Sequence, residues 1–159
     1  MTIDTNEFRQ ALGRFATGVC LVTVSDAQRG PLATTVNSFS SVSLEPALVL
    51  WSIQTSSEHL QVYTECRHFG ISILREDQAA LSGHYAQAGG HEALPEHFSE
   101  GPQGEPRLTY ALAHFSCSTY AVYPGGDHQI IVGEVVAFEA AQATPLVFFS
   151  GEYRSLSGQ

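Results

Sequence analysis

The apolar positions near the N-terminus repeat with the period of an α-helix. Asp4 followed by Glu7 matches a capping box at the start of this segment, and Gly18 is a candidate stop. The sequence therefore predicts a first helix with one apolar face. The residues that would form this face are Phe8, Ala11, Leu12, Phe15 and Ala16.

Most later apolar runs are typical of β-strands. The β-branched run Val19–Val24 is followed by turn residues at Asp26–Gly30 and by an extended segment at Leu32–Asn37, which predicts an antiparallel pair. The composition of Pro124–His128 also indicates a turn. Further strands are predicted at Ala47–Ile53, His68–Leu74, Ala113–Tyr123, Gln129–Ala140 and Leu146–Ser150.

Helical and irregular segments separate these strands. We expect a short helix near Glu58–Cys66, with Ser56 or Ser57 as its N-cap, and an amphipathic helix at Asp77–Ala86. The hydroxyl-rich stretch Ser38–Ser43 is interpreted as an ordered, partly buried loop. Gln87–Arg107 has no sustained period and predicts a long loop of the kind that often serves as a lid.

Many strands and few short helices favour a closed or nearly closed antiparallel barrel. The chain shows no internal repeat and no linker, so residues 1–159 are expected to form a single domain. A doubly wound α/β sheet is disfavoured because helices and strands do not alternate. No G-x-G-x-x-G motif follows the first strand, so any nicotinamide nucleotide would bind without the glycine-rich turn of a Rossmann fold.

The charge balance narrows the range of partners. Sixteen acidic residues against seven basic ones give a net charge of -9, and all seven bases are Arg, which argues against nucleic-acid binding. The apolar runs are too short to span a bilayer, so no membrane association is expected. The three cysteines, Cys20, Cys66 and Cys117, lack metal-site spacing and are interpreted as reduced thiols of a cytoplasmic protein.

Two clusters of hydroxyl side chains are candidates for holding a phosphate. If both lie at the same end of the barrel, hydroxyls, backbone N–H groups and a helix N-terminus bind the anion without any Lys. The alternative is that these residues only cap a helix and satisfy the backbone of a loop. One cluster contains Thr34, Thr35, Asn37, Ser38, Ser40, Ser41 and Ser43, and the other contains Thr55, Ser56 and Ser57.

The histidines offer no metal site, because neither H-E-x-x-H nor H-x-H occurs. His128 differs from the others, since it follows Gly-Gly-Asp in a turn and immediately precedes a strand. It is either a pocket residue or a structural hydrogen-bonding group. The sequence contains no G-x-S-x-G motif, so it gives no support to a serine hydrolase. The remaining candidates, His59, His84, His91 and His97, lie on segments predicted to be exposed and receive no role.

Several motifs together resemble the flavin reductase-like family of FMN-binding split barrels. They are Phe8–Val19, Thr35–Pro46, Gly126–His128 and Gly133–Val135, and the match runs in order from about Phe8 to Leu156. The resemblance implies an antiparallel Greek-key split β-barrel with a few flanking helices. It also implies an NAD(P)H:flavin oxidoreductase that is usually a homodimer and that supplies reduced flavin to a partner monooxygenase.

The resemblance also implies roles for individual residues. The stretch Thr35–Ser38 is expected along the isoalloxazine ring, with backbone N–H groups near its N5 and O4 edge. His128 is the catalytic candidate and is expected to place the nicotinamide for hydride transfer to flavin N5, a step that needs no general base. The candidate cofactor-binding residues are Thr34, Thr35, Val36, Asn37, Ser38, Ser40, Ser41, Ser56, Ser57, Tyr85, Ala86, Asp127, His128 and Tyr153.

The choice among cofactors stays partly open. FMN and FAD are both compatible with the sequence. In Ser150–Tyr153, Ser150 precedes Gly151 where the family often carries an Arg, and Glu152 adds a negative charge beside Tyr153. If this segment approaches the phosphates of the dinucleotide, both features favour NADH over NADPH as the reductant. Two alternatives remain at this point: a flavin-binding protein without reductase turnover, and a structural or sensing barrel that binds no flavin.

Overall fold

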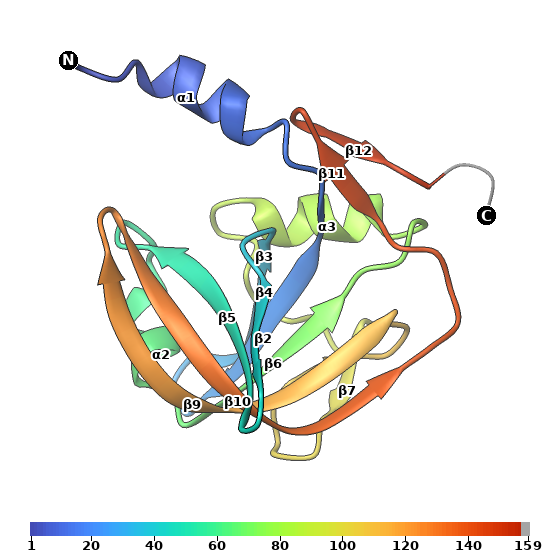
Figure 1. Cartoon of the computed structure of the whole chain (residues 1–159). Helices are drawn as coiled ribbons and strands as arrows, with labels where there is room; N and C mark the ends of the chain where they lie inside the picture. The colour runs from blue at the N-terminus through green and yellow to red at the C-terminus, as the bar shows by residue number, and fades with distance from the viewer. Residues whose placement is uncertain (157–159) are drawn as a thin grey trace.

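One curved antiparallel sheet forms the body of the molecule in this computed structural model, which describes residues 1–156 (Figure 1). Its strand order is β3-β2-β6-β9-β10-β5-β4, so β3 and β4 are its two edges. The predicted mainly β barrel is thereby confirmed. The strands are β2 (Cys20–Asp26), β3 (Gly30–Val36), β4 (Ser40–Leu44), β5 (Ala47–Gln54), β6 (His68–Ile73), β9 (Ala113–Gly125) and β10 (His128–Ala140).

Strand β2 is buried on both faces, which explains its continuous rather than alternating apolar run. Cys20, Val22 and Val24 point into the barrel core, which also contains Trp51 and Phe69. Leu21, on the opposite face of β2, packs in a second cluster with Ala33, Tyr85 and Leu146. This second cluster seats helix α3 (Ala79–Ala86) against the sheet, and thereby fixes one wall of the site described below.

Helix α1 (Thr5–Leu12) begins where the sequence predicts but ends earlier. Asp4 is the N-cap, and its carboxylate accepts hydrogen bonds from the Asn6 and Glu7 amides, each at 2.9 Å. The predicted stop at Gly18 is wrong, because Gly13 is the C-cap and Thr17–Gly18 forms the short strand β1. Figure 1 shows α1 projecting from the barrel, and no residue of the helix is buried.

Two other local predictions are corrected by the structure. Ser38–Ser43 was expected to be a loop, yet β4 pairs with β5, so its backbone is satisfied while its side chains stay largely exposed. Helix α2 (Leu60–Glu65) is capped by His59 without a side-chain hydrogen bond, so neither Ser56 nor Ser57 is its N-cap. Ser57 Oγ instead accepts a hydrogen bond from the His59 amide at 3.2 Å.

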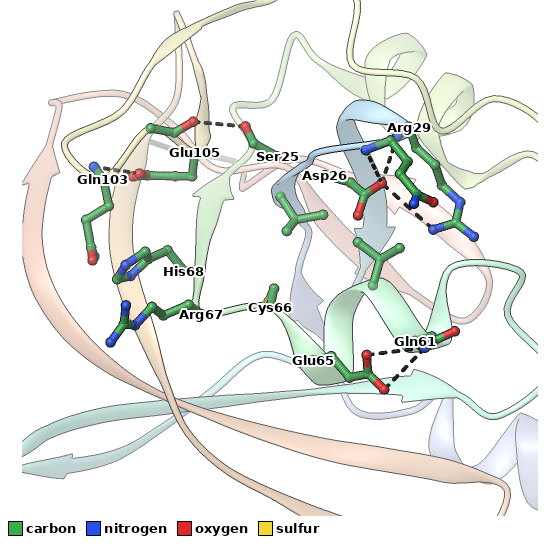
Figure 2. A pocket seen from close by; sticks show the side chains of 14 residues that line it. Ser25, Asp26, Arg29, Gln61, Glu65, Cys66, Arg67, His68, Gln103 and Glu105 are labelled. Atoms are coloured by element: carbon green, nitrogen blue, oxygen red, sulfur yellow. Dashed lines mark hydrogen bonds and ion pairs between the residues drawn. The ribbon is translucent and has the colours of Figure 1, made fainter.

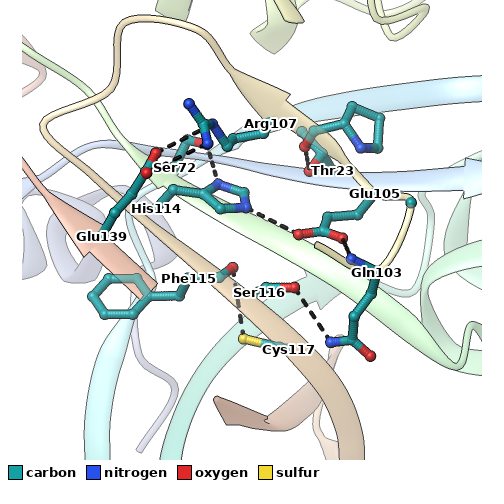
Figure 3. Close-up of polar contacts among 12 residues, drawn as sticks. Thr23, Ser72, Gln103, Glu105, Arg107, His114, Phe115, Ser116, Cys117 and Glu139 are labelled. Atoms are coloured by element: carbon teal, nitrogen blue, oxygen red, sulfur yellow. Dashed lines mark hydrogen bonds and ion pairs between the residues drawn. The ribbon is translucent and has the colours of Figure 1, made fainter. Parts of the chain in front are cut away.

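The predicted loop Gln87–Arg107 is largely ordered by contacts with the barrel. It contains β7 (Phe98–Glu100) and ends in β8 (Pro106–Leu108), which pair with each other. Figure 3 shows Glu105 of this segment beside His114 on β9, with Ser72 of β6 on the other side of the ring. A small third sheet of β1, β11 (Val147–Phe149) and β12 (Glu152–Arg154) holds the C-terminal hairpin near the base of α1.

Residues 1–156 contain neither a membrane-spanning helix nor a cluster of metal-ligating side chains. No helix in this range has the length and apolar character needed to cross a membrane. In the same range, no cluster of three or more His, Cys, Asp or Glu side chains is arranged to hold a metal ion.

Candidate functional site

A cleft of about 610 Å³ lies where the ends of β3 and β5 meet the segment that follows α3. Members of both hydroxyl clusters meet in it, from residues 34–38 in the first and 56–57 in the second, although β4 and β5 separate these two groups along the chain. Its lining residues are Thr34, Thr35, Val36, Asn37, Ser38, Trp51, Ser52, Ile53, Gln54, Ser56, Ser57, Glu58, Ala86, Ala88, His91 and His128.

Nine of the fourteen predicted cofactor-binding residues line this cleft. They are Thr34, Thr35, Val36, Asn37, Ser38, Ser56, Ser57, Ala86 and His128. Ser40, Ser41, Tyr85, Asp127 and Tyr153 do not line it. The first group converges from four separate parts of the chain, which is the arrangement that a single bound ligand requires.

The outer backbone edge of β3 provides hydrogen-bond donors to the cleft. The Ala33 N–H points away from β2 and donates to the His91 carbonyl at 2.8 Å. Because N–H groups alternate along an antiparallel strand, the Thr35 N–H points the same way, beyond the reach of the 91–93 segment. Asn37 and Ser38 follow the end of β3, and their N–H groups donate to no other group within residues 1–156.

The side chains along this edge mostly serve to hold it in place. Thr35 Oγ1 donates to the Ser82 carbonyl at 2.7 Å, and so joins β3 to α3. The Ser38 hydroxyl accepts from the Ser52 amide at 2.9 Å and donates to the Ser52 carbonyl at 3.3 Å, and so joins the end of β3 to β5. These residues therefore offer the cleft their backbone N–H groups rather than their hydroxyls.

The turn after β5 offers free hydroxyls instead. Ser56 is exposed and has no side-chain hydrogen bond within residues 1–156, while the Ser57 hydroxyl accepts only from the His59 amide and keeps its proton to donate. Thr55 fixes this turn, since both its amide and its Oγ1 donate to the Asp127 carbonyl, at 2.9 and 3.1 Å. That contact also places the turn next to His128.

His128 is half-exposed at the start of β10, and Asp127 orients its ring. The Nδ1–H donates to Asp127 Oδ1 at 2.6 Å, which leaves Nε2 as the ring nitrogen that is available to a ligand. The hydrogen bond from His128, together with its charge, lowers the pKa of the exposed Asp127 carboxyl. Asp127 therefore acts on the cleft through the orientation of His128 and not by lining it.

Tyr85 and Tyr153 support the cleft from outside. Tyr85 is fully buried, and its hydroxyl accepts from the Leu94 amide at 3.1 Å and contacts His97 Nδ1 at 2.7 Å. The hydroxyls of Tyr153 and Ser82 lie 2.6 Å apart, which connects the C-terminal hairpin to α3. Ser40 and Ser41 are exposed on the edge strand β4, where the Ser40 hydroxyl donates to the Ser41 carbonyl.

Sequence reasoning missed His91 and Glu58. His91 lines the cleft from the segment predicted to be an irregular loop, and its ring is T-stacked on His59 with centroids 5.2 Å apart. Glu58 lines the same part of the cleft, with its carboxylate 3.6 Å from His59 Nε2. Only the pairing of residues 91–93 with β3 reveals this cluster, because no local pattern marks it.

A second pocket, of about 470 Å³, lies at the opposite end of the β2–β3 ladder (Figure 2). Its polar side chains largely satisfy one another. Asp26 accepts from the Arg29 amide at 2.7 Å, and the Gln61 amide group contacts Glu65 at 3.3 Å. Glu105, at its wall, accepts from the Gln103 amide at 2.8 Å. Most polar groups of this pocket are thus paired with one another, but the guanidinium of Arg67, which also lines it, has no hydrogen bond or ion pair within residues 1–156.

Comparison with known proteins identifies the family. A family model described as flavin reductase like domain matches residues 12–157. The chain belongs to the flavin reductase-like family. The FMN reductase (NADH) SmoA of Agrobacterium fabrum is 40% identical to this flavin reductase-like chain over 157 residues, which cover 98% of the chain and 88% of the relative.

Two further proteins extend this comparison. The reductase component of 4-hydroxyphenylacetate 3-monooxygenase from Thermus thermophilus is 40% identical over 152 residues, covering 94% of the flavin reductase-like chain and 95% of the relative. The solved NADH:FAD oxidoreductase SgcE6 of Streptomyces globisporus C-1027, in complex with NAD and FAD fragments, has a TM-score of 0.88 at 30% identity. Its alignment covers 99% of this chain and 98% of that one.

These similarities confirm the family, the split-barrel fold, the oxidoreductase class and the flavin and nicotinamide cofactors expected from the sequence. The cleft also fits a flavin chemically. The unpaired N–H groups of Thr35 and Asn37 suit the carbonyl and ring-nitrogen acceptors of an isoalloxazine, and the free hydroxyls of Ser56 and Ser57 suit a phosphate. Trp51, in the cleft wall, has a buried Nε1–H with no acceptor within residues 1–156.

Proposed function

We propose that this chain reduces flavin with NADH, and that the cleft between β3, β5 and the segment after α3 holds both cofactors. The observation that carries this assignment is the convergence of unpaired donors on one cleft. The N–H groups of Thr35 and Asn37 supply donors on one side. Ser56, Ser57 and His128 supply them on the other.

Each part of the cleft has a separate task in this proposal. The rigid edge of β3 binds the polar rim of the ring, and the turn after β5 binds the ribityl phosphate. When bound, flavin supplies the acceptor for the hydride of the reduced nicotinamide. His128, held by Asp127 through Nδ1, presents Nε2 and places the nicotinamide against the ring. Ala86 closes the cleft from the end of α3.

The charge of the cleft supports NADH as the reductant. None of its lining residues is Arg or Lys, whereas the extra phosphate of NADPH is usually bound by Arg. Glu152 lies on the nearby C-terminal hairpin, where Arg154 Nη2 already pairs with its carboxylate at 2.7 Å. The relative SmoA, an FMN reductase (NADH), agrees with this choice.

The test is anaerobic reduction of FMN and FAD, followed by the loss of oxidised-flavin absorbance after NADH or NADPH is added. We expect rapid turnover with NADH. His128→Ala should slow reduction by about tenfold or more while flavin affinity holds. His68→Ala is the matched control, because His68 lines the other pocket. Flavin binding without reduction above the protein-free rate would instead indicate a flavin-binding protein without turnover.

A homodimer is the second part of the proposal, and helix α1 supports it. Phe8 and Leu12 on this helix and Phe15 just after it are 51%, 59% and 80% exposed, so their apolar surface is largely uncovered within residues 1–156. Such a stripe fits a second copy of the chain. Light scattering is expected to give the mass of a dimer, and Leu12→Asp should shift it toward the monomer. A wild-type monomer at micromolar concentration contradicts this part.

The third part of the proposal is a separate monooxygenase that consumes the reduced flavin. It is supported by the relative from Thermus thermophilus, which is a reductase component of such a system. The expected behaviour is that oxidised flavin binds more tightly than, or as tightly as, reduced flavin, so that product leaves. Retention of reduced flavin through gel filtration under anaerobic conditions would argue against transfer to a diffusing partner.

A further inference from the structure

The flavin cleft lacks a permanent cation for a phosphate group. Its lining residues include no Arg and, since the chain contains no Lys, none of the usual point charges for an anion. Glu58 adds a negative charge beside Ser56 and Ser57. Histidines are the only lining side chains that can become positive, and they are His91 and His128.

His91 is held rigidly at this part of the cleft. Its carbonyl accepts from the Ala33 amide at 2.8 Å, and its Nδ1 lies 3.1 Å from the Ala33 carbonyl. Because a carbonyl only accepts, Nδ1 carries the proton of this bond. The remaining nitrogen, Nε2, has no hydrogen-bond partner within residues 1–156 and is not buried. The ring therefore has one nitrogen for the protein and one for a ligand.

Neighbouring residues connect His91 to the turn after β5 that carries Ser56 and Ser57, called the hydroxyl turn below. Its ring contacts the ring of His59, whose backbone amide donates to Ser57 Oγ. The charged groups facing this cluster are Glu58, beside His59 Nε2, and the Asp26–Arg29 pair beyond it. Burial lowers the pKa of His59, although the charge of Glu58 opposes this. His59 does not line the cleft, so His91 is the ring of this pair that faces a ligand.

We propose that His91 is the cationic partner of the ribityl phosphate of flavin, in place of the Arg or Lys that the cleft lacks. The inference rests on the proposed function and deepens it. Protonated His91 donates through Nε2 to a phosphate oxygen that also accepts from Ser56 and Ser57. Flavin binding then depends on pH through the phosphate, because imidazole is the side chain that changes charge between about pH 5 and 8.

The experiment compares dissociation constants of FMN and of riboflavin, which lacks the phosphate, by quenching of flavin fluorescence. The ratio of the two constants isolates the phosphate contribution. It is measured near pH 6.5 and near pH 8.5, where the second proton of the phosphate has largely left. His91→Gln keeps a donor for the Ala33 carbonyl but carries no charge, and His91→Arg keeps the charge at both pH values. His84→Gln is the control, because His84 is exposed and does not line the cleft.

In the wild type and in His84→Gln, the preference for FMN should fall about tenfold from the lower to the higher pH, the value of one charge-assisted hydrogen bond. His91→Gln should have the low preference at both pH values, and His91→Arg the high one. A preference in His91→Gln that still responds to pH as in the wild type overturns the assignment of His91.

The outcomes also separate this inference from the function on which it rests. If FMN and riboflavin both bind and are reduced, but the ratio ignores His91, the reductase function stands and only the role of His91 fails. If neither flavin binds at either pH, both the function and the role of His91 fail. FAD is the third ligand. Each phosphate of its pyrophosphate carries only one negative charge, so its preference over riboflavin should change less with pH than that of FMN.

Discussion

Removing the buried carboxylate of Glu105 should destabilise the barrel far more than removing an exposed one. Glu105 and His114 are 1% and 2% exposed, and His114 Nε2 lies 3.1 Å from Glu105 Oε1 (Figure 3). Glu105 Oε2 also accepts from the Gln103 amide at 2.8 Å. On the other side of the ring, His114 Nδ1 lies 2.8 Å from the Ser72 hydroxyl. This chain of contacts fastens the end of the Gln87–Arg107 segment to β6 and β9.

The magnitude depends on what the substitution leaves unpaired. Glu105→Leu removes both acceptors and strands two buried donors, for which we expect a loss of about 3–5 kcal/mol in the free energy of unfolding. Glu105→Gln keeps one acceptor for the Gln103 amide. Its amide group can donate to His114 Nε2 once the ring proton moves to Nδ1 and is donated to Ser72, so the loss should be only about 1–2 kcal/mol.

Urea unfolding followed by circular dichroism measures both variants, with Asp77→Asn as the control. Asp77 is exposed and pairs with Arg75 at 3.7 Å, a contact worth about 0–1 kcal/mol. The reasoning is refuted if Glu105→Leu costs no more than this control. It is also refuted if Glu105→Gln lowers the free energy of unfolding as much as Glu105→Leu does. The ring of His114 would then not have changed to the tautomer that donates from Nδ1 to Ser72.

The same network predicts how stability responds to acid. Burial alone raises the pKa of the Glu105 carboxyl, but hydrogen bonds from His114, Ser116 and backbone amides outweigh it, so the pKa lies below its ordinary value. A lowered folded-state pKa means that the stabilisation is present above the unfolded pKa of about 4.3 and is lost as the pH falls through the folded one. Wild type should therefore lose more stability than Glu105→Gln on acidification below about pH 4. Equal losses would contradict this.

Three further substitutions test the cleft and its supports. Asp127→Asn should lower the rate of flavin reduction several-fold with little change in flavin affinity, because it weakens the 2.6 Å contact that orients His128. Stopped-flow reduction measures the rate, and a flavin titration measures the affinity. Gly133→Ala should cost about 1–3 kcal/mol in urea unfolding, because its Cβ would lie 2.5 Å from Phe69 Cζ in the barrel core. Tyr85→Phe should speed hydrogen exchange of the Leu94 amide, which loses its acceptor, and an unchanged rate would show that this contact does not hold the segment.

Most strands could be predicted because the sheet buries their apolar side chains, which leaves runs of apolar and β-branched residues in the sequence. Val19–Val24 and Ala47–Ile53 lie within two residues of β2 and β5. The edge strand β4 could not, because Ser40–Leu44 buries none of its side chains and gains its strand conformation only by pairing with β5. The apolar stripe of α1 was predicted only in part, because Phe15 and Ala16 of the predicted stripe lie beyond the helix, which ends at Leu12. The pattern could not show that no residue of this helix is buried within residues 1–156.

The residues of the candidate site also fall into two groups: those marked by a local sequence pattern and those placed only by long-range pairing. The hydroxyl turn and the edge of β3 carry local signals, so Thr35, Asn37 and Ser56 could be named in advance. His91 could not, because its place in the cleft depends on a bridge between β3 and a segment nearly sixty residues later, held by two bonds to Ala33. Long-range pairing of this kind leaves no periodicity in the sequence.

The composition gives the net charge of the chain but not the positions of its charged side chains. The absence of Lys and the net charge of -9 argue against a nucleic-acid surface, and both facts are visible without a structure. They do not say where the seven arginines lie. The fold places none of them in the lining of the flavin cleft, while it brings His91 and His128 there from distant segments. In the function that we propose, this cleft holds a phosphate through hydroxyls, backbone N–H groups and titratable rings. A change of pH is then a sharper probe of the bound ligand than a change of salt concentration alone.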